Sequence, residues 1–551
     1  MKERQPAVVP AVIVRGSRGA VTSPHHLASQ AGLGILRSGG TAVDAAIATN
    51  AALAVVTSFM CGLGGDAFWL IHDAAATTTT ALNGSGRSAA GATIDAAHAA
   101  GHEQMPLRGA WTVTVPGAVD SWRLAHERHG LLPWAALFEP AIELAHDGFP
   151  AGDGWVGAIA NGAKAFGESG DWARTYRPLG RDWRLGERVT LPALARSLRA
   201  IADGGAETAY SGALGARSAE YLESRGSPLR ATDFAAHRSD WLEPIATTYR
   251  GVTSVSHPPN SSGPLALLTL NVLSRFDPPS ADRFDGAGVA DVDWVHLGLE
   301  ASRLVLAERD ASLTDRESMA PGALARLLSP EFARELADRI DRTRYTPPKP
   351  STHPRGGGTI YLATADRWGN AVSLIESNYA GFGSGLVDPE TGISFQNRGA
   401  FFRLDAGHAN ALAPRKRTMH TLTPGMLLRD GRPWIVHGSM GGEIQPQVFA
   451  QFVSAVVDGG LDVGTAVAAP RWAAEVEEHL GAPSLTVVES RYHPSVISGL
   501  QARGHDVQVA APWSSGMGHE HAIEFVRDAS TDDVSLAATA DPRSEGLPQA
   551  W

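Results

Sequence analysis

Cysteine is almost absent from this chain of 551 residues, which contains only Cys61. A single cysteine excludes both a disulfide within the chain and a metal cluster built on several thiolates. Long hydrophobic runs are missing too, since no stretch of about 20 apolar residues is uninterrupted, as a membrane-spanning helix requires. The opening segment, MKERQPAVVPAVIVRGSRGAVTSPHH, lacks the apolar core of a signal peptide, and prolines interrupt it. We therefore expect a cytoplasmic protein.

The chain also lacks an excess of positive charge. Its net charge of −11 and pI of about 6.0 argue against a nucleic-acid partner, which requires a basic surface. No Gly-Lys-Ser/Thr motif is present, and the glycines of CGLGGDAFWLIHD follow a predicted helix and precede a strand, the reverse of the dinucleotide-binding order. These glycines are best interpreted as tight turns, so no nucleotide cofactor is predicted.

What the chain does contain is a globular composition, with 43% hydrophobic and 19% charged residues. Only the polar tail after Asp528 has a composition typical of disorder. The segment TAVDAAIATNAALAVVTSF is apolar nearly all round and predicts a buried helix with Thr41 as its N-cap. Further helices are predicted at 446–458 and 463–470. Strands are predicted in LRGAWTVTV, LVDPETGISFQN, MLLRDGRPWIVHG and SLTVVES.

The strongest linker signal is RTRYTPPKPSTHPRGGG, which ends directly before Thr359. After it, TIYLATADRWGNAVSLIES alternates apolar and polar residues and predicts a β-hairpin. A threonine inside a chain is a weak nucleophile, whereas an N-terminal threonine can use its own α-amine as the base. Glycine leaves the preceding peptide open to attack. The Gly358–Thr359 junction is therefore either the end of a loop or a site of self-cleavage.

Many other segments resemble the γ-glutamyltranspeptidase family of N-terminal-nucleophile hydrolases. They are GGTAVDAAIATNAALAVV, GLGGDAFWLI, VTVPGAVDSW, LPWAALFEPAIELAHDGFP, YRGVTSVSHPPNSSG, DRWGNAVSLIESNYAGFGSGLVDPETGISFQNR, LAPRKR, GSMGG and AAPRW. The resemblance implies an α/β fold, a four-layer αββα sandwich. It also implies a precursor that cuts itself into residues 1–358, the large subunit, and 359–551, the small subunit. The two chains would stay intertwined as a heterodimer, and whether such heterodimers pair further is left open.

The resemblance also implies the catalytic residues. Thr359 takes the place of the nucleophile, Ser377 that of the supporting hydroxyl, and Gly441 and Gly442 those of the oxyanion-binding glycines. The nucleophile is followed by Ile-Tyr where the family usually has Thr-His. The implied mechanism passes through an acyl-enzyme, with water as co-substrate and without a metal or organic cofactor.

The residues that hold a glutamyl group in the family are replaced in this chain. A glutamyl group carries an α-carboxylate and an α-ammonium, so its pocket needs a fixed cation and a fixed anion. The cationic arginine is replaced by Ser85, with Arg87 two residues later, and the anionic aspartate is replaced by Phe401. The remaining positions are taken by His420 and Thr421 for a pair of serines, Tyr379 for an asparagine and Arg398 for a glutamine.

Without its anion, a buried ammonium is disfavoured by several kcal/mol, on the order expected for an unpaired buried charge. We therefore predict hydrolysis of a small, anionic, non-glutamyl amide. Arg398 and Arg87 are the candidates to bind its carboxylate, because guanidinium pairs bidentately with carboxylate.

The variants in the QNRG and KR-x-x-H-T segments resemble the branch of the family that includes oxamate amidohydrolase. Asn378 lies beside the family's asparagine position, so a slip of one residue could restore that contact. Two alternatives remain at this point. One is true γ-glutamyl transfer or glutathione hydrolysis, with Arg87 shifted into the carboxylate site. The other is an uncut, non-catalytic relative that uses the fold for binding.

Overall fold

A computed structural model describes residues 11–347, 357–476, 485–528, 530–531 and 533–551. Most of the predicted linker before Thr359 lies outside these residues. Among the described residues, no helix is both long and apolar enough to cross a membrane.

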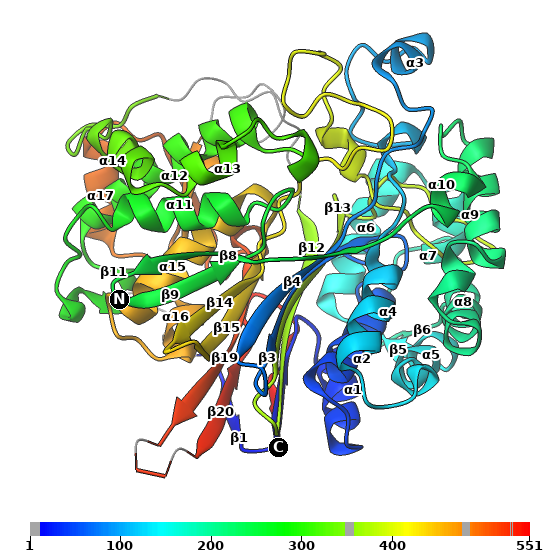
Figure 1. Cartoon of the computed structure of the whole chain (residues 1–551), viewed down its shortest axis with the longest axis horizontal. Coiled ribbons are helices and arrows are strands. Elements are labelled where there is room, and N and C mark those ends of the chain that lie inside the picture. Colours follow the sequence, from blue (N-terminus) through cyan, green and yellow to red (C-terminus); the bar gives the residue numbers. More distant parts are fainter. Residues whose placement is uncertain (1–10, 348–356, 477–484, 529, 532) are drawn as a thin grey trace.

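Two seven-stranded sheets lie face to face at the centre of the molecule (Figure 1). The first, in spatial order, contains β1 Ile13–Gly16, β20 Val534–Thr539, β19 His519–Arg527, β15 Arg432–Met440, β14 Gly425–Arg429, β9 Val252–Ser256 and β8 Ile245–Tyr249. The second contains β21 Gln549–Ala550, β2 Gly19–Thr22, β12 Gly358–Asp366, β13 Ala371–Tyr379, β3 Asp66–Asp73, β4 Thr78–Gly84 and β7 Asp240–Leu242.

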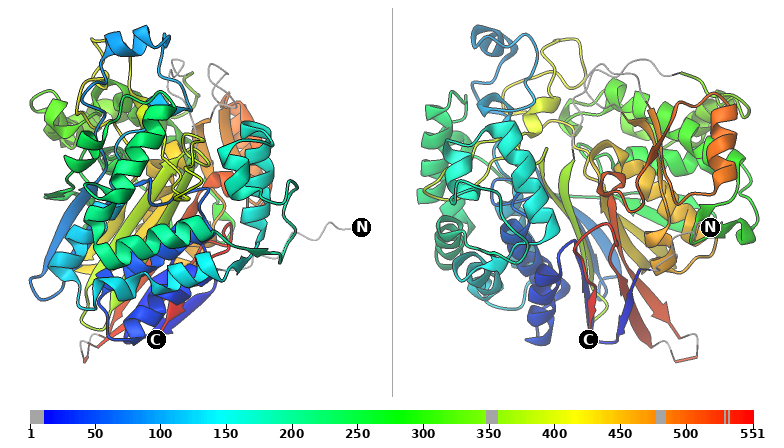
Figure 2. Two further views of the ribbon diagram at one scale, coloured as in Figure 1. Left: turned by 90° about the vertical axis from the view of Figure 1, so that its right-hand side faces the viewer. Right: turned by 180° about the vertical axis from the view of Figure 1, so that it is seen from behind.

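Helices cover the outer face of each sheet, as the front view (Figure 1) and the rear view (Figure 2) show. The second sheet is covered mainly by α1 His26–Arg37, α2 Ala42–Val56, α4 Ala118–His129, α5 Glu139–His146, α6 Asp153–Phe166, α8 Pro192–Gly204 and α9 Ala213–Ser224. The first is covered by α11 Gly263–Leu273, α12 Val292–Ser312, α14 Pro330–Asp338, α15 Gln445–Val457 and α16 Val463–Ala468. A small sheet of β16 Trp472–Val476, β17 Leu485–Glu489 and β18 Val507–Ala510 packs with α17 Pro494–Ala502 beside them. This is the predicted αββα sandwich.

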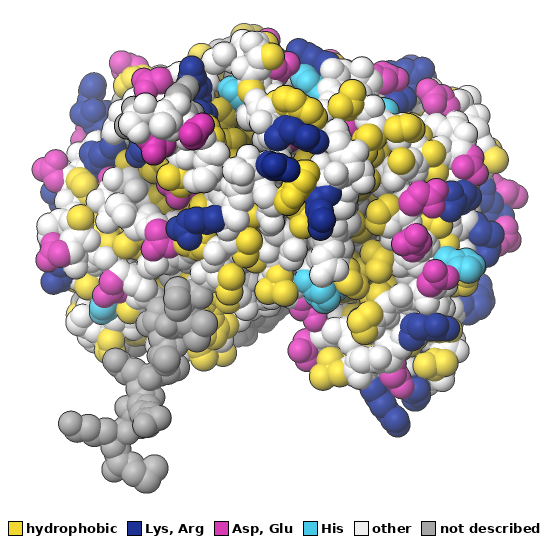
Figure 3. All heavy atoms as spheres, turned by 90° about the horizontal axis from the view of Figure 1, so that it is seen from below, with side chains coloured by type: hydrophobic (Ala, Val, Ile, Leu, Met, Phe, Trp, Pro, Cys, Tyr) yellow, Lys and Arg dark blue, Asp and Glu magenta, His cyan; other side chains and the backbone are white. Residues whose placement is uncertain are grey.

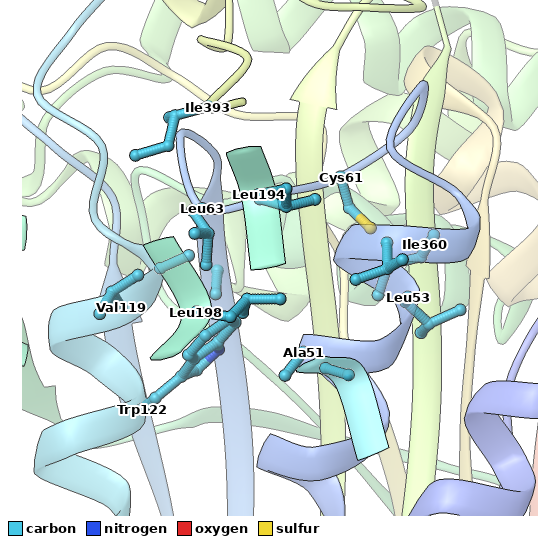
Figure 4. Packing of buried hydrophobic residues seen from close by; sticks show 14 of the residues in the cluster. Ala51, Leu53, Cys61, Leu63, Val119, Trp122, Leu194, Leu198, Ile360 and Ile393 are labelled. Atoms are coloured by element: carbon cyan, nitrogen blue, oxygen red, sulfur yellow. The ribbon is translucent and has the colours of Figure 1, made fainter. Parts of the chain in front are cut away.

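The buried helix α2 begins as the sequence predicts. The Thr41 hydroxyl accepts a hydrogen bond from Asp44 N, and the Asp44 carboxylate accepts one from Thr41 N, which forms a capping box. All fifteen residues of the helix are buried. Figure 4 shows Ala51 and Leu53 of this helix in the core between helices and sheet, together with Trp122 of α4 and Ile360 of β12.

Three predictions for particular segments are wrong. Residues 107–115 contain a short 3-10 helix, Ala110–Thr112, instead of a strand. Residues 386–397 form a looped segment with two isolated bridges, Val387 to Ser394 within the loop and Phe395 to Gly64. Much of the described part of the polar tail is ordered, because β20 pairs with both β1 and β19 inside the first sheet.

One face of the molecule carries charges of both signs. On the face seen in Figure 3, acidic and basic side chains alternate with apolar ones over both halves of the molecule. Cys61, the single cysteine, is buried and free, and burial raises the pKa of its thiol.

Candidate active site

Thr359 lies near the start of β12, a central strand of the second sheet. Along β12 the side chains alternate: Ile360 and Leu362 enter the core under the helices, whereas Tyr361 and Ala363 face the other sheet. Thr359 has the parity of Tyr361, so its hydroxyl points into the space between the sheets, and the residue is only 1% exposed. The packing of Ile360 thus fixes the direction of the candidate nucleophile.

Ser377 on the neighbouring strand β13 connects this hydroxyl to the peptide bond that is predicted to be cut. Its Oγ lies 2.9 Å from Thr359 Oγ1 and donates a hydrogen bond of 2.8 Å to the carbonyl oxygen of Gly358. A serine hydroxyl has a single proton, so with this proton donated to Gly358 O, the Thr359 hydroxyl is the donor in the contact between the two side chains. The hydrogen bond to Gly358 O polarises the carbonyl that the Thr359 hydroxyl would attack.

Gly357 and Gly358, which precede Thr359, have different surroundings. A Cβ on Gly358 would lie only 3.0–3.1 Å from backbone atoms of Tyr379, Ala380 and Gly381, so this position has no room for a side chain. A Cβ on Gly357 would lie 3.6 Å from Gly442 N, which places the Gly441–Gly442 peptide beside the chain that leads to Thr359.

Gly441 and Gly442 have φ angles of 141° and 60°, which favour glycine. Their proximity to Gly357 fits the predicted oxyanion-binding role, in which backbone N–H groups stabilise the developing negative charge.

A β-bulge at Asn378 shapes the loop that carries Arg398. Thr359 pairs with Ser377 and Gly358 pairs with Tyr379, so Asn378 is the extra residue on β13. The Asn378 carbonyl accepts a hydrogen bond from Asn397 N, and the Asn397 side chain accepts one from Ala380 N. The residue next to Asn397 is Arg398, the first of the short helix η6 Arg398–Phe401. The bulge therefore places Arg398 over the end of β13.

Arg398 is completely buried and reaches the hydroxyl group that contacts the candidate nucleophile. Its Nη2 donates to Ser377 Oγ at 2.8 Å, and its Nη1 donates to Thr421 Oγ1 at 3.1 Å. Its Nε has no hydrogen-bond partner among the described residues, and none of the described carboxylates forms an ion pair with it. Burial lowers the pKa of Arg398 to about 10, and the carboxyl of Asp66 opposes this shift. The side chain nevertheless remains cationic at neutral pH.

Aromatic rings enclose this guanidinium. Its central carbon lies 4.7 Å from the centre of the Tyr379 ring and 5.7 Å from that of Phe401, and the two rings pack at 4.5 Å. Phe401 is fully buried, so an apolar ring occupies the position that the family resemblance assigns to an aspartate. Nothing in this ring pair could balance an ammonium group.

The other candidates for substrate binding are only partly brought together. Thr421 contacts Arg398, and His420 precedes Thr421 in the same buried segment. Arg87 instead forms an ion pair of 3.3 Å with Asp315 and longer ones with Asp240 and Glu317. The Asn378 side chain turns toward the other face of the sheet, where its Nδ2 donates to Ser58 O at 3.5 Å.

Sequence reasoning missed Asp66, the first residue of β3. It pairs with Ser377 in the sheet, so Thr359, Ser377 and Asp66 form a row across three neighbouring strands on the face between the sheets. Its Oδ2 lies 3.4 Å from His420 Nε2. The available signal was a carboxylate at the start of an otherwise apolar strand, in GGDAFWLI.

A group of possible metal ligands lies elsewhere in the molecule. Atoms of His296, Glu300 and His505 all lie within 4.8 Å of one another, and all three residues are buried. However, His296 Nδ1 and His505 Nε2 share a hydrogen bond of 2.8 Å, and Glu300 pairs with Arg303 at 2.8 Å. These groups satisfy one another, and they take no part in the chemistry at Thr359.

Two stacked sheets between helix layers, with a threonine at the head of a central strand, define the class of N-terminal-nucleophile hydrolases, which act on carbon–nitrogen bonds. Within that class the chain belongs to the gamma-glutamyltranspeptidase family, whose model matches residues 28–551. The resemblance seen in the sequence motifs is thereby confirmed.

Three relatives illustrate the range of the family near this chain. It is 38% identical to the glutathione hydrolase-like YwrD proenzyme of Bacillus subtilis, over 97% of this chain and 98% of the relative. It is 37% identical to the oxamate amidohydrolase proenzyme of Klebsiella pneumoniae, over 96% of this chain and 98% of the relative. The crystal structure of cephalosporin acylase from Bacillus halodurans matches with a TM-score of 0.89 and 37% identity, over 100% of this chain and 99% of that chain.

Proposed function

We propose that this protein cuts itself between Gly358 and Thr359 and then hydrolyses a small anionic amide through an acyl-threonine intermediate. In the mature form the freed amine of Thr359 acts as the base for its own hydroxyl. Gly441 and Gly442 bind the oxyanion, and water releases the acyl group. The names of the relatives, which include proenzymes and an oxamate amidohydrolase, support both steps of this proposal.

The observation that carries the anionic substrate is the buried guanidinium of Arg398. A buried cation is costly unless an anion pairs with it, and none of the described carboxylates does so here. The Nε of Arg398 is one donor without a hydrogen-bond partner among the described residues. A substrate carboxylate would form the close ion pair that Arg398 lacks and would accept this hydrogen bond.

The distances also limit the length of the acyl group. Arg398 Nη2 and Thr359 Oγ1 each contact the same Ser377 oxygen at under 3 Å, so they lie within about 6 Å of each other. The attacked carbonyl carbon must lie about 3–3.5 Å from the hydroxyl. A carboxylate held by Arg398 can therefore lie close to that carbon. This short path favours half-amides of small dicarboxylic acids as substrates.

A panel of amides tests this proposal. We expect the mature protein to release ammonia from oxamate or malonamate faster than from longer half-amides. Little or no activity is expected on a γ-glutamyl anilide or on glutathione, because Phe401 and Ser85 remove both charged contacts. Acetamide and propionamide serve as neutral controls of similar size. Strong turnover of the γ-glutamyl substrates would instead favour a glutathione hydrolase, and a cut protein inactive on the whole panel would refute the assignment.

A further inference from the structure

Asp66 is held in the row of Thr359 and Ser377 by only one of its two carboxyl oxygens. Gly86 N and Gly117 N both donate to Oδ1 at 3.1 Å, which fixes the side chain. Oδ2 is buried and has no hydrogen-bond partner among the described residues. A buried carboxyl oxygen without a partner is rare and costly, so it indicates that a ligand or a proton completes this group.

The imidazole of His420 faces this free oxygen. Its Nε2 lies 3.4 Å from Asp66 Oδ2, but the geometry does not form a hydrogen bond, and Nδ1 also lacks a partner among the described residues. The ring is fully buried and packs edge-on against Phe68 at 5.0 Å. Burial and the nearby cations Arg398 and Arg417 keep the pKa of His420 well below its usual value, so the ring is neutral at pH 7.

The charges in the pocket decide whether the Asp66 carboxyl can stay ionised when an anionic substrate binds. Burial raises the pKa of Asp66 to about 7, and Arg398 opposes that rise. A substrate carboxylate on Arg398 would add a second buried negative charge to the one on Asp66, with Arg398 and Arg417 as the cations that act on Asp66. Two carboxylates in one buried site cannot both stay ionised, and the usual result is that they share a proton. The other titratable groups acting on the pair are Arg417, His257, Glu376 and Tyr210.

We propose that Asp66 and His420 form a second anchor of the substrate pocket, and that Asp66 takes up one proton when a carboxylate binds to Arg398. This inference rests on the proposed function and adds to it the recognition of the substrate's charge state. The protonated Asp66 would donate from Oδ2 to an oxygen of the acyl group, and the neighbouring Nε2–H of the neutral His420 would donate to the same oxygen. Asp66 is a specificity-determining residue in this scheme, and the nucleophile and its amine base are untouched.

The direction of the pH effect follows from proton uptake. Below about pH 7 the free enzyme already carries the proton on Asp66, so binding needs no further proton. Above about pH 7 the proton must be taken from solution, and kcat/KM should fall about tenfold per pH unit. The amine of Thr359 must also be deprotonated to act as a base, and this requirement gives an ascending limb that every variant should share.

Asp66→Asn should remove the descending limb and leave the ascending one. The amide oxygen can still accept from Gly86 and Gly117, and completed self-cleavage shows that the variant is folded. Glu376→Gln is the matched control, because Glu376 is another buried carboxyl with a pKa raised to about 8 by burial, and it faces α2 on the opposite side of β13. The descending limb should persist in this control. An unchanged descending limb in Asp66→Asn would overturn the proposal.

Calorimetry gives a readout that does not depend on turnover. Oxalate, which has no amide to cleave, is titrated into the cut wild-type protein at pH 8 in two buffers of different ionisation enthalpy. We expect uptake of about one proton per site in the wild type and almost none in Asp66→Asn. Binding with equal uptake in both proteins, or with none in the wild type, overturns the role of Asp66 alone. If oxalate does not bind while a neutral amide is hydrolysed, the anionic substrate of the proposed function falls as well.

Discussion

Thr359→Ala is expected to remain a single chain of 551 residues, whereas the wild-type protein is expected to separate into residues 1–358 and 359–551 under denaturing conditions. The physical reason is that the Thr359 hydroxyl, which follows the Gly358 carbonyl directly, is the proposed nucleophile, and Ser377 already polarises that carbonyl. Denaturing electrophoresis followed by N-terminal sequencing measures the result. The sequence of the small chain should begin Thr-Ile-Tyr.

Two further variants make this test specific. Thr359→Ser keeps a hydroxyl and should still be cut, although more slowly. Ser377→Ala removes the hydrogen bond to Gly358 O and should slow the cleavage while the fold persists. A folded wild-type protein that stays in one piece would argue against every enzymatic assignment and in favour of a binding protein.

Arg398→Gln is expected to lower kcat/KM on the best anionic amide by roughly 10- to 100-fold, equivalent to about 1.5–3 kcal/mol for a charged hydrogen bond. The expected cause is loss of the cation that contacts Ser377 and Thr421 in the pocket. We expect self-cleavage to reach completion, because Thr359, Ser377 and the glycines remain. The kinetics are then compared on fully cut protein.

Comparison with two other variants separates charge from shape. Arg398→Lys should recover only part of the activity, since an ammonium lacks the planar pair of donors. Arg87→Gln should have a much smaller effect, because Arg87 already pairs with Asp315. Wild-type kinetics in a fully cut Arg398→Gln protein would show that Arg398 is structural and that the pocket takes another kind of substrate.

The fold was predictable where local pattern and family resemblance agree. The hairpin around 366–370 and helix α2 follow directly from alternation and from the capping box. Residues 107–115 and 386–397 have strand-like composition but no neighbouring strand to pair with, so turns and glycines decide their shape. The C-terminal tail shows the opposite case. Its strand β20 forms because it pairs with β19 and with β1, and β1 lies more than 500 residues away in the sequence.

Candidate site residues could be predicted only where a sequence motif or the replacement of a family residue marks them. Thr359 and Ser377 follow from the motif, and Arg398 follows from the replacement of a neutral residue by a cation. Asp66 could not be connected to them, because a sheet partner separated by 311 positions leaves no trace in a single sequence. Arg87 and Arg398 also look equivalent in the sequence. They differ because Arg87 forms ion pairs with carboxylates, whereas the Arg398 guanidinium donates to the hydroxyl groups of Ser377 and Thr421.

Both large sheets interleave strands from before and after the predicted cut. In the second sheet β12 and β13 lie between β2 and β3, and in the first sheet β14 pairs with β9 while β20 pairs with β1. Separating the two chains would therefore break the centre of both sheets, so dilution should not release either one. Refolding should differ sharply: the uncut Thr359→Ala chain can regain its structure alone, at a rate independent of concentration. The cut protein must first bring two molecules together, so its recovery should slow as the solution is diluted.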